Sequence, residues 1–170
     1  MPPGAERILG LDPGSRHTGY GLILRRRDGL ELLAQGRLSP PRDLDLPARL
    51  GWLGVSLGES LAEWQPEVAV LETPFLGLNP RSLVVLAQAR GALLGALAAG
   101  RVAVREYSPA EIKSAVTGNG RADKTQVARM VALQLSGVPA KASADATDAL
   151  AIALCYTHRS RIERLTGGGP

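Results

Sequence analysis

The chain has 170 residues, 45% of them apolar, which is the length and composition of one compact domain with its own core. Lys and Arg outnumber Asp and Glu by 20 to 16, and the single cysteine excludes an internal disulfide framework. Because the first six residues lack the cationic and apolar regions of a secretory signal, we expect a cytoplasmic protein.

Three short strands are predicted near the start of the chain, after a flexible extension over residues 1–6. Residues 7–11 form an apolar run that stops at the turn signal DPG. Residues 18–24 and 30–37 are two further apolar runs joined through a DG dipeptide, which is a hairpin signal. The three arginines at 25–27 are interpreted as a solvated hairpin tip. These features predict an antiparallel meander.

Helices and strands alternate in the middle of the chain. Residues 46–64 carry leucines at helical spacing, and residues 67–72 form a buried strand. An Ala- and Gly-rich helix is expected over residues 81–99, and a fifth strand over residues 101–106. This order predicts an α/β layer fold with a mixed five-stranded sheet, three antiparallel strands plus two parallel, flanked by helices.

The helix at residues 81–99 contains the most apolar stretch of the chain. It is short for a membrane span and holds Gln88 and Arg90 near its middle. We therefore interpret it as a buried helix and expect no membrane association.

Three further helices are predicted in the last third. The stretch SPAE at residues 108–111 combines a capping Ser, a Pro at the first helical position and a Glu at the third. That helix ends at GNG, residues 118–120, and the next covers about 123–135. A last helix is expected over 143–162, so that the domain spans residues 7–162 and residues 163–170 form a disordered tail.

Four carboxylates come from three separate elements. Asp12 ends the first strand and Glu72 ends the fourth, so both lie at one sheet edge if these strands are parallel neighbours. Asp145 and Asp148 are three residues apart at the start of the last helix and share a face. The four side chains could therefore converge.

A cluster of this kind favours bound cations. Like charges raise one another's pKa, and hard divalent ions such as Mg²⁺ relieve the repulsion through oxygen ligands. Two such ions can activate a water molecule and stabilise the leaving oxygen of a phosphodiester. Setting the four acids aside leaves 12 acidic against 20 basic residues, which favours a polyanionic partner but also fits a basic protein without one.

Each acid also has a structural interpretation. Asp12 could be a turn former before Pro-Gly, and Glu72 a solvent-facing strand end. Asp145 could stabilise a helix N-terminus. Asp148 is harder to explain in this way, since a largely apolar helix segment follows it.

Four motifs taken together carry a resemblance. The segments ILGLDPGSRHTGYGLI, LETPFLGLNPRS with AQARG, YSPAEIKSAVTGNGRADKTQVARMV and ADATDALAIAL resemble the bacterial RuvC Holliday junction resolvases in order and spacing, from Arg7 to about Arg159. The resemblance implies a ribonuclease H-like fold and a homodimer that resolves four-way DNA junctions by symmetric paired nicks in homologous recombination and repair. It also implies 5′-phosphate and 3′-hydroxyl ends, two Mg²⁺ per subunit with Mn²⁺ as a possible substitute, and a RuvA–RuvB branch-migration partner.

The resemblance assigns roles to particular residues. The metal-binding acids would be Asp12, Glu72, Asp145 and Asp148. Lys113 and Lys124 would lie near the scissile phosphate, although without the motif both would be taken for exposed helix lysines. The candidate DNA-binding residues are Phe75, Arg81, Lys113, Asn119, Arg121 and Lys124. The candidate dimer-interface residues are Leu83, Ala87, Arg90, Gly91 and Leu94.

Two of these assignments have alternatives in the sequence. Phe75, the only Phe, would stack on a base, or it could fill the core as a loop hydrophobe. Pro74 stands before it, where the resemblance leads us to expect a residue other than proline in many relatives. The helix at 81–99 could be buried within one subunit instead of forming a dimer.

Three other functions fit parts of the sequence. The motif DPGS…TG also resembles the first phosphate loop of actin-like ATP-binding proteins, but the chain is short for two such domains and has no second loop. A non-catalytic junction-binding protein would not require all four acids. Another ribonuclease H-like nuclease, such as a transposase-like or hybrid-cleaving enzyme, would share them.

Overall fold

One mixed sheet organises the chain. The computed structural model describes residues 5–74, 79–139 and 142–166, and its strands lie in the order β3-β2-β1-β4-β5. Strands β1 (Glu6–Asp12), β2 (Thr18–Arg25) and β3 (Leu30–Leu38) form an antiparallel meander. Strands β4 (Val68–Glu72) and β5 (Ala103–Tyr107) continue the sheet parallel to β1. The predicted mixed five-stranded sheet is confirmed.

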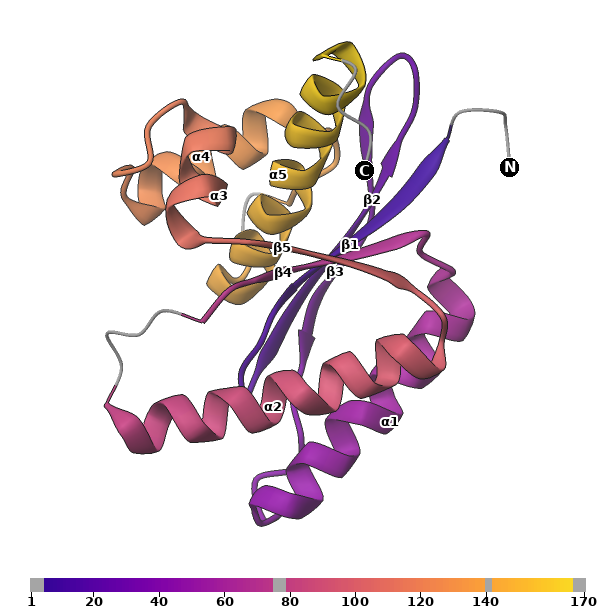
Figure 1. Cartoon of the computed structure of the whole chain (residues 1–170), viewed down its shortest axis with the longest axis vertical. Coiled ribbons are helices and arrows are strands. Elements are labelled where there is room, and N and C mark those ends of the chain that lie inside the picture. The colour runs from indigo at the N-terminus through magenta and orange to yellow at the C-terminus, as the bar shows by residue number, and fades with distance from the viewer. Residues whose placement is uncertain (1–4, 75–78, 140–141, 167–170) are drawn as a thin grey trace.

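Helices cover both faces of this sheet (Figure 1). One face carries α1 (Leu46–Trp64) and α2 (Pro80–Ala99). The other face carries α3 (Pro109–Thr117), α4 (Lys124–Gln134) and α5 (Ala144–Thr166). The capping box predicted for α3 is present, because Ser108 and Glu111 accept each other's main-chain N–H groups. The layer order is therefore helices, sheet, helices.

Alternation along the central strands divides the core into two clusters. Ile8 and Val70 belong to the cluster under α5, whereas Leu9 and Leu71 belong to the cluster under α1 and α2. Successive strand residues point to opposite faces, so each continuous apolar run supplies both cores.

Helix α5 lies unusually close to β1 and β2. A Cβ atom on Gly10 would stand 2.0 Å from the carbonyl oxygen of Ala149, and one on Gly19 would stand 2.2 Å from the carbonyl oxygen of Asp145. Glycine at these positions allows the helix backbone to rest directly on the strands. The start of α5 is thereby held against the end of β1.

The ends of the fold differ from the predicted ones. Glu6 belongs to β1, not to a flexible extension, because it pairs with Arg25 and accepts a hydrogen bond from Tyr156. Arg25 is consequently no part of a solvated tip, and its guanidinium also donates to Ser160. Helix α5 continues to Thr166, beyond the predicted end at residue 162, because no Gly or Pro interrupts it before Gly167.

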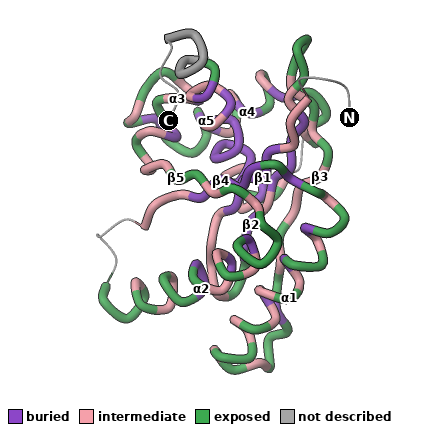
Figure 2. Tube along the Cα trace, turned by 45° about the vertical axis from the view of Figure 1, so that its right-hand side comes forward, coloured by how far each residue is buried: buried purple, intermediate pink, exposed green. Residues whose placement is uncertain are grey.

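Helix α2 is far more exposed than expected. By length and composition alone it could cross a membrane, as core helices of soluble proteins also could, but only 22% of its most apolar 18-residue window is buried. The colouring in Figure 2 shows the same contrast with the buried central strands. The prediction of a buried helix is wrong for this protomer, because α2 packs on α1 along one side only.

Candidate metal centre

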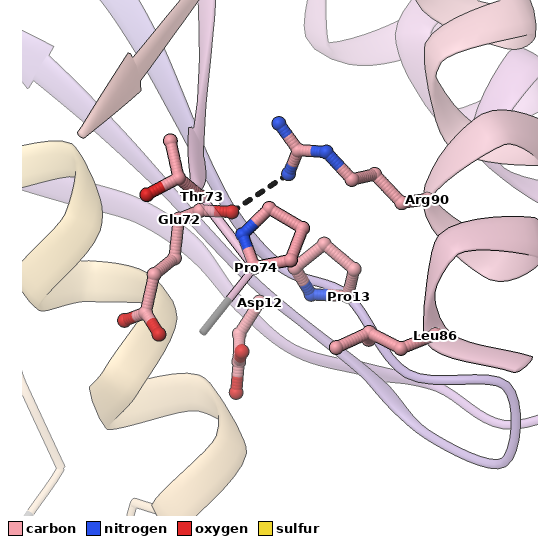
Figure 3. A pocket seen from close by; sticks show the side chains of 7 residues that line it. All are labelled: Asp12, Pro13, Glu72, Thr73, Pro74, Leu86 and Arg90. Atoms are coloured by element: carbon pink, nitrogen blue, oxygen red, sulfur yellow. Dashed lines mark hydrogen bonds between the residues drawn. The ribbon is translucent and has the colours of Figure 1, made fainter. Parts of the chain in front are cut away.

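Asp12 and Glu72 lie at the same edge of the sheet. Strands β1 and β4 are parallel neighbours in which Leu11 pairs with Leu71, so the acid that follows each leucine ends its strand at the same level. Alternation turns both side chains toward the face covered by α5, away from α2 (Figure 3).

The first turns of α5 bring two more carboxylates to this edge. Gly19 pairs with Asp12 across β1 and β2, and the backbone of Asp145 rests on Gly19. The hydroxyl of Ser143 accepts from the N–H of Ala146 at 3.3 Å and so supports the helix start. Asp148 follows one turn later on the same face.

The carboxylates lie close enough to repel one another. Burial, followed by the charges of Asp148, Glu72 and Asp145, raises the pKa of Asp12 from 3.8 to about 7. The pKa of Glu72 is raised by burial and by the charge of Asp148. In the absence of a cation, the protonated form of Asp12 is therefore strongly populated near neutral pH.

Basic side chains partly offset this repulsion. Lys124 donates from Nζ to Oδ2 of Asp148 at 2.8 Å, and this hydrogen bond raises the pKa of the lysine. The charge of Lys113 lowers the pKa of Glu72. Both lysines thus lie within electrostatic reach of the acids.

Arg37 is a neighbour of the acids that sequence reasoning missed. It extends from β3, and its Nη1 lies 3.8 Å from Oδ2 of Asp145. No motif or spacing signals this contact, because only the folded sheet brings the end of β3 beside α5.

The donor set fits a hard divalent cation. All four candidate ligands supply carboxylate oxygens, and a 2+ charge would lower the raised pKa values. As the side chains stand, no three Asp, Glu, His or Cys residues in the described part of the chain are close enough to share one ion. Since Lys124 occupies one oxygen of Asp148, ion binding requires side-chain rotation in this cluster.

The candidate DNA-binding residues other than the two lysines come from several parts of the fold. Arg81 is exposed in the first turn of α2, and Arg121 is exposed in the connection between α3 and α4. The side-chain oxygen of Asn119 accepts from the N–H of Arg121 at 2.9 Å, so Asn119 shapes its own loop. Phe75 lies outside the described residues.

The candidate interface residues of α2 do not all face outward. Ala87 and Gly91 are exposed, whereas Leu83 and Leu94 are half-buried. Arg90 is only 7% exposed and points into its own subunit, toward the ends of β4 and β5. Its guanidinium is held by groups of the same subunit, which differs from the outward direction expected of an interface residue.

Relatives of known identity match almost the whole chain. The family model for the crossover junction endodeoxyribonuclease RuvC matches residues 8–156. The enzyme of that name from Bordetella parapertussis is 46% identical over 165 residues, 94% of this chain and 89% of its own. The one from Herminiimonas arsenicoxydans is 42% identical over 163 residues, 95% of this chain and 88% of its own.

Solved structures agree with this assignment. Thermus thermophilus RuvC in complex with a Holliday junction substrate superposes with a TM-score of 0.85 at 29% identity, covering 92% of this chain and 96% of its own. The yeast mitochondrial Holliday junction resolvase Ydc2 shares the fold, with a TM-score of 0.70 at 15% identity, covering 94% of this chain and 81% of its own. The ribonuclease H-like fold is thereby confirmed, and the chain belongs to the RuvC family of crossover junction endodeoxyribonucleases.

Proposed function

We propose that this protein is a metal-dependent endonuclease that resolves four-way DNA junctions by symmetric paired nicks in homologous recombination and DNA repair. The observation that carries the proposal is the convergence of Asp12, Glu72 and the first turns of α5, where burial and mutual repulsion raise the pKa of Asp12 to about 7. Such repulsion destabilises the folded protein unless a bound cation relieves it. The family and the junction complex of a relative support the same substrate.

Asp12, Glu72, Asp145 and Asp148 would hold two Mg²⁺ ions per subunit, with Mn²⁺ as a substitute. Bound ions of this kind make a water molecule a stronger nucleophile and stabilise charge on the leaving oxygen. The products would then carry 5′-phosphate and 3′-hydroxyl ends. The role of the protein is to hold the four carboxylates together at the sheet edge, where the bound ions would keep them ionised.

Lys124 and Lys113 would supply positive charge to the phosphate. Lys124 is exposed and now pairs with Asp148, so it can release that carboxylate to an ion and turn to a phosphate oxygen. Lys113 reaches the same edge from α3. Phe75, Arg81, Asn119 and Arg121 would contact the DNA around the site.

A homodimer would place two such sites on one junction, as paired nicks require. The face of α2 that carries Leu83, Ala87, Gly91 and Leu94 is the proposed interface, because it is apolar and only partly covered in the protomer. We further propose one nuclease domain, cytoplasmic location and cooperation with a RuvA–RuvB branch-migration complex.

The test uses a labelled mobile four-way junction beside plain duplex and an RNA–DNA hybrid, each with Mg²⁺ or Mn²⁺. We expect paired symmetric nicks in the junction and little cutting of the other two substrates. Preferential cutting of the hybrid would favour another ribonuclease H-like nuclease. Junction binding without cutting under either metal would contradict catalysis, and ATP hydrolysis would favour an actin-like module.

A further inference from the structure

Arg90 is the one charged side chain among the residues classed as buried in the described part of the chain. It lies in the middle of α2, on the side that faces the ends of β4 and β5. Burying a guanidinium is costly unless its N–H groups find strong acceptors. The contacts that Arg90 makes are therefore expected to matter to the protein.

Those contacts tie α2 to a proposed metal ligand. Nη1 donates to the main-chain carbonyl oxygen of Glu72 at 2.7 Å, and Nη2 forms an ion pair with Glu106 of β5. Residue 72 is the last of β4, so the guanidinium holds the strand end where the chain leaves the sheet. One side chain thus joins the helix and both parallel strands.

Arg90 acts on the main chain of Glu72 and not on its carboxylate. Figure 3 shows the guanidinium reaching the carbonyl group from one side while the carboxylate points to the other. The charges that shift the pKa of Glu72 are those of Asp148, Lys113 and Lys124. The effect of Arg90 on this ligand is therefore one of position.

Packing alone does not hold this strand end against α2. A cavity of about 200 Å³ lies between them, lined by Asp12, Pro13, Glu72, Thr73, Pro74, Leu86 and Arg90. On the other side, the N–H of Thr73 donates to the carbonyl oxygen of Tyr107 at 2.9 Å. The guanidinium of Arg90 links the strand end to α2 on the side of the cavity, where apolar contact between them is incomplete.

We infer that Arg90 is a positioning residue for the metal centre. Through its hydrogen bond to the main chain of Glu72, it couples the position of α2 to the direction of the Glu72 carboxylate. The inference rests on the proposed function, since it takes Glu72 as a metal ligand. Because α2 also carries the proposed dimer surface, a shift of this helix on dimerisation would reach the metal centre through Arg90.

The experiment compares the wild type with Arg90→Gln, Arg90→Lys and Arg101→Gln. Arg101 is exposed just beyond the end of α2, so its variant controls for the loss of one positive charge. Mn²⁺ binding is measured by electron paramagnetic resonance without DNA. The Mn²⁺ concentration that gives half-maximal junction cutting is measured in parallel, together with thermal melting and junction binding without metal.

We expect Arg90→Gln to weaken Mn²⁺ binding and to raise the half-saturating Mn²⁺ concentration, each by roughly 10–100-fold, as for groups that orient metal ligands. The maximal rate at saturating Mn²⁺ should fall less than the affinity. The Mn²⁺ affinity of Arg90→Lys should lie between those of the wild type and Arg90→Gln, because a point charge cannot reproduce both contacts of the planar guanidinium. Arg101→Gln should match the wild type.

A folded Arg90→Gln with wild-type Mn²⁺ affinity would overturn the inference. If that variant does not fold, Arg90→Lys decides in the same way, since it retains the charge. If the wild type binds Mn²⁺ but cuts no junction, the proposed function fails while the binding data still decide the role of Arg90. A wild type that binds no Mn²⁺ overturns both.

Discussion

Helices α5 and α2 are both long and rich in apolar residues, but the fold uses them in opposite ways. Every residue of α5 from Ala149 to Cys155 is buried against the sheet and its neighbouring helices. In α2 the buried residues are only Ala89, Arg90, Leu93 and Leu97, and Val84 is 57% exposed. Apolar composition therefore does not tell which helix is central.

The difference between the two helices follows from how close each can come to a neighbour. Gly10 and Gly19 let α5 rest on the strand backbones, which holds Asp145 and Asp148 at the sheet edge. The two glycines within α2 have no such neighbour, because nothing lies within 4 Å of a Cβ placed on Gly91 or on Gly95. Helix α5 thus supports the candidate site through close backbone contact, whereas α2 leaves much of its apolar surface uncovered in the protomer.

The largest expected effect is on junction cutting, when the acid Asp148 of α5 is removed. Asp148→Asn should reduce junction cutting by about 1,000-fold or more, because losing a metal ligand removes several kcal/mol of transition-state stabilisation, at about 1.4 kcal/mol per tenfold. Junction binding without metal should persist, since the basic surface remains. Single-turnover cutting and gel-shift assays measure both.

Asp28→Asn at the exposed hairpin tip is the matched control and should cut like the wild type. Retained activity in Asp148→Asn would show that Asp148 is not an essential metal ligand.

Gly10→Ala tests the close packing of α5 on β1. The added methyl would overlap the Ala149 carbonyl oxygen, 2.0 Å from the Cβ position, and the nearest atoms are all main-chain atoms of α5, which cannot move aside as a flexible side chain could. We expect a loss of at least about 1–3 kcal/mol in the free energy of unfolding, measured by urea denaturation. A variant as stable as the wild type would show that α5 can shift freely, contrary to the comparison.

The pH dependence of stability tests the charge cluster between α5 and the strand ends. In metal-free protein the folded state raises the pKa of Asp12 from 3.8 to about 7, so between these values the folded state binds more protons than the unfolded one. The stability of the wild type relative to Asp12→Asn should therefore fall as the pH rises from about 4 to about 7. Urea midpoints across this range measure it.

Mg²⁺ should restore part of this stability above pH 7, where it finds the carboxylates ionised. Parallel pH profiles for wild type and Asp12→Asn would contradict the burial and repulsion inferred for Asp12.

The smallest effect is expected from a substitution on the exposed side of α2, and it concerns stability and dimerisation. Gly91→Ala should stabilise the protomer by about 0.5–1 kcal/mol, because alanine is the better helix former and the site has room. The same methyl should weaken the dimer if a partner helix packs closely there. Denaturation and sedimentation equilibrium separate these opposite effects.

Gly58→Ala in α1 is the control, since it is also an open, exposed helix position but lies outside the proposed interface. It should stabilise the protomer without changing the dimer. An equal response of the dimer to both variants would place the interface elsewhere.

Most elements of this fold were predictable because each has a local cause. Leucine spacing predicts residues 46–64 as a helix, which is the observed extent of α1, and the SPAE box predicts the start of α3. The order of strands and helices predicts the mixed sheet. Asp12 and Glu72 were expected to share an edge if their strands were parallel neighbours, and the observed pairing of β1 with β4 meets that condition. The family motifs add the acids of α5, whose contacts no periodicity reveals.

The sequence by itself determined the elements, their order and the identity of the acidic and basic candidates, because these depend on neighbouring residues and on composition. Only the tertiary structure decided that Arg90 turns inward to Glu72, that Arg37 reaches Asp145 and that α2 is left largely exposed. These features join residues far apart in the chain, and their geometry depends on how closely backbones approach. Side-chain direction on a helix that is apolar all round is set by its neighbours, not by its own pattern.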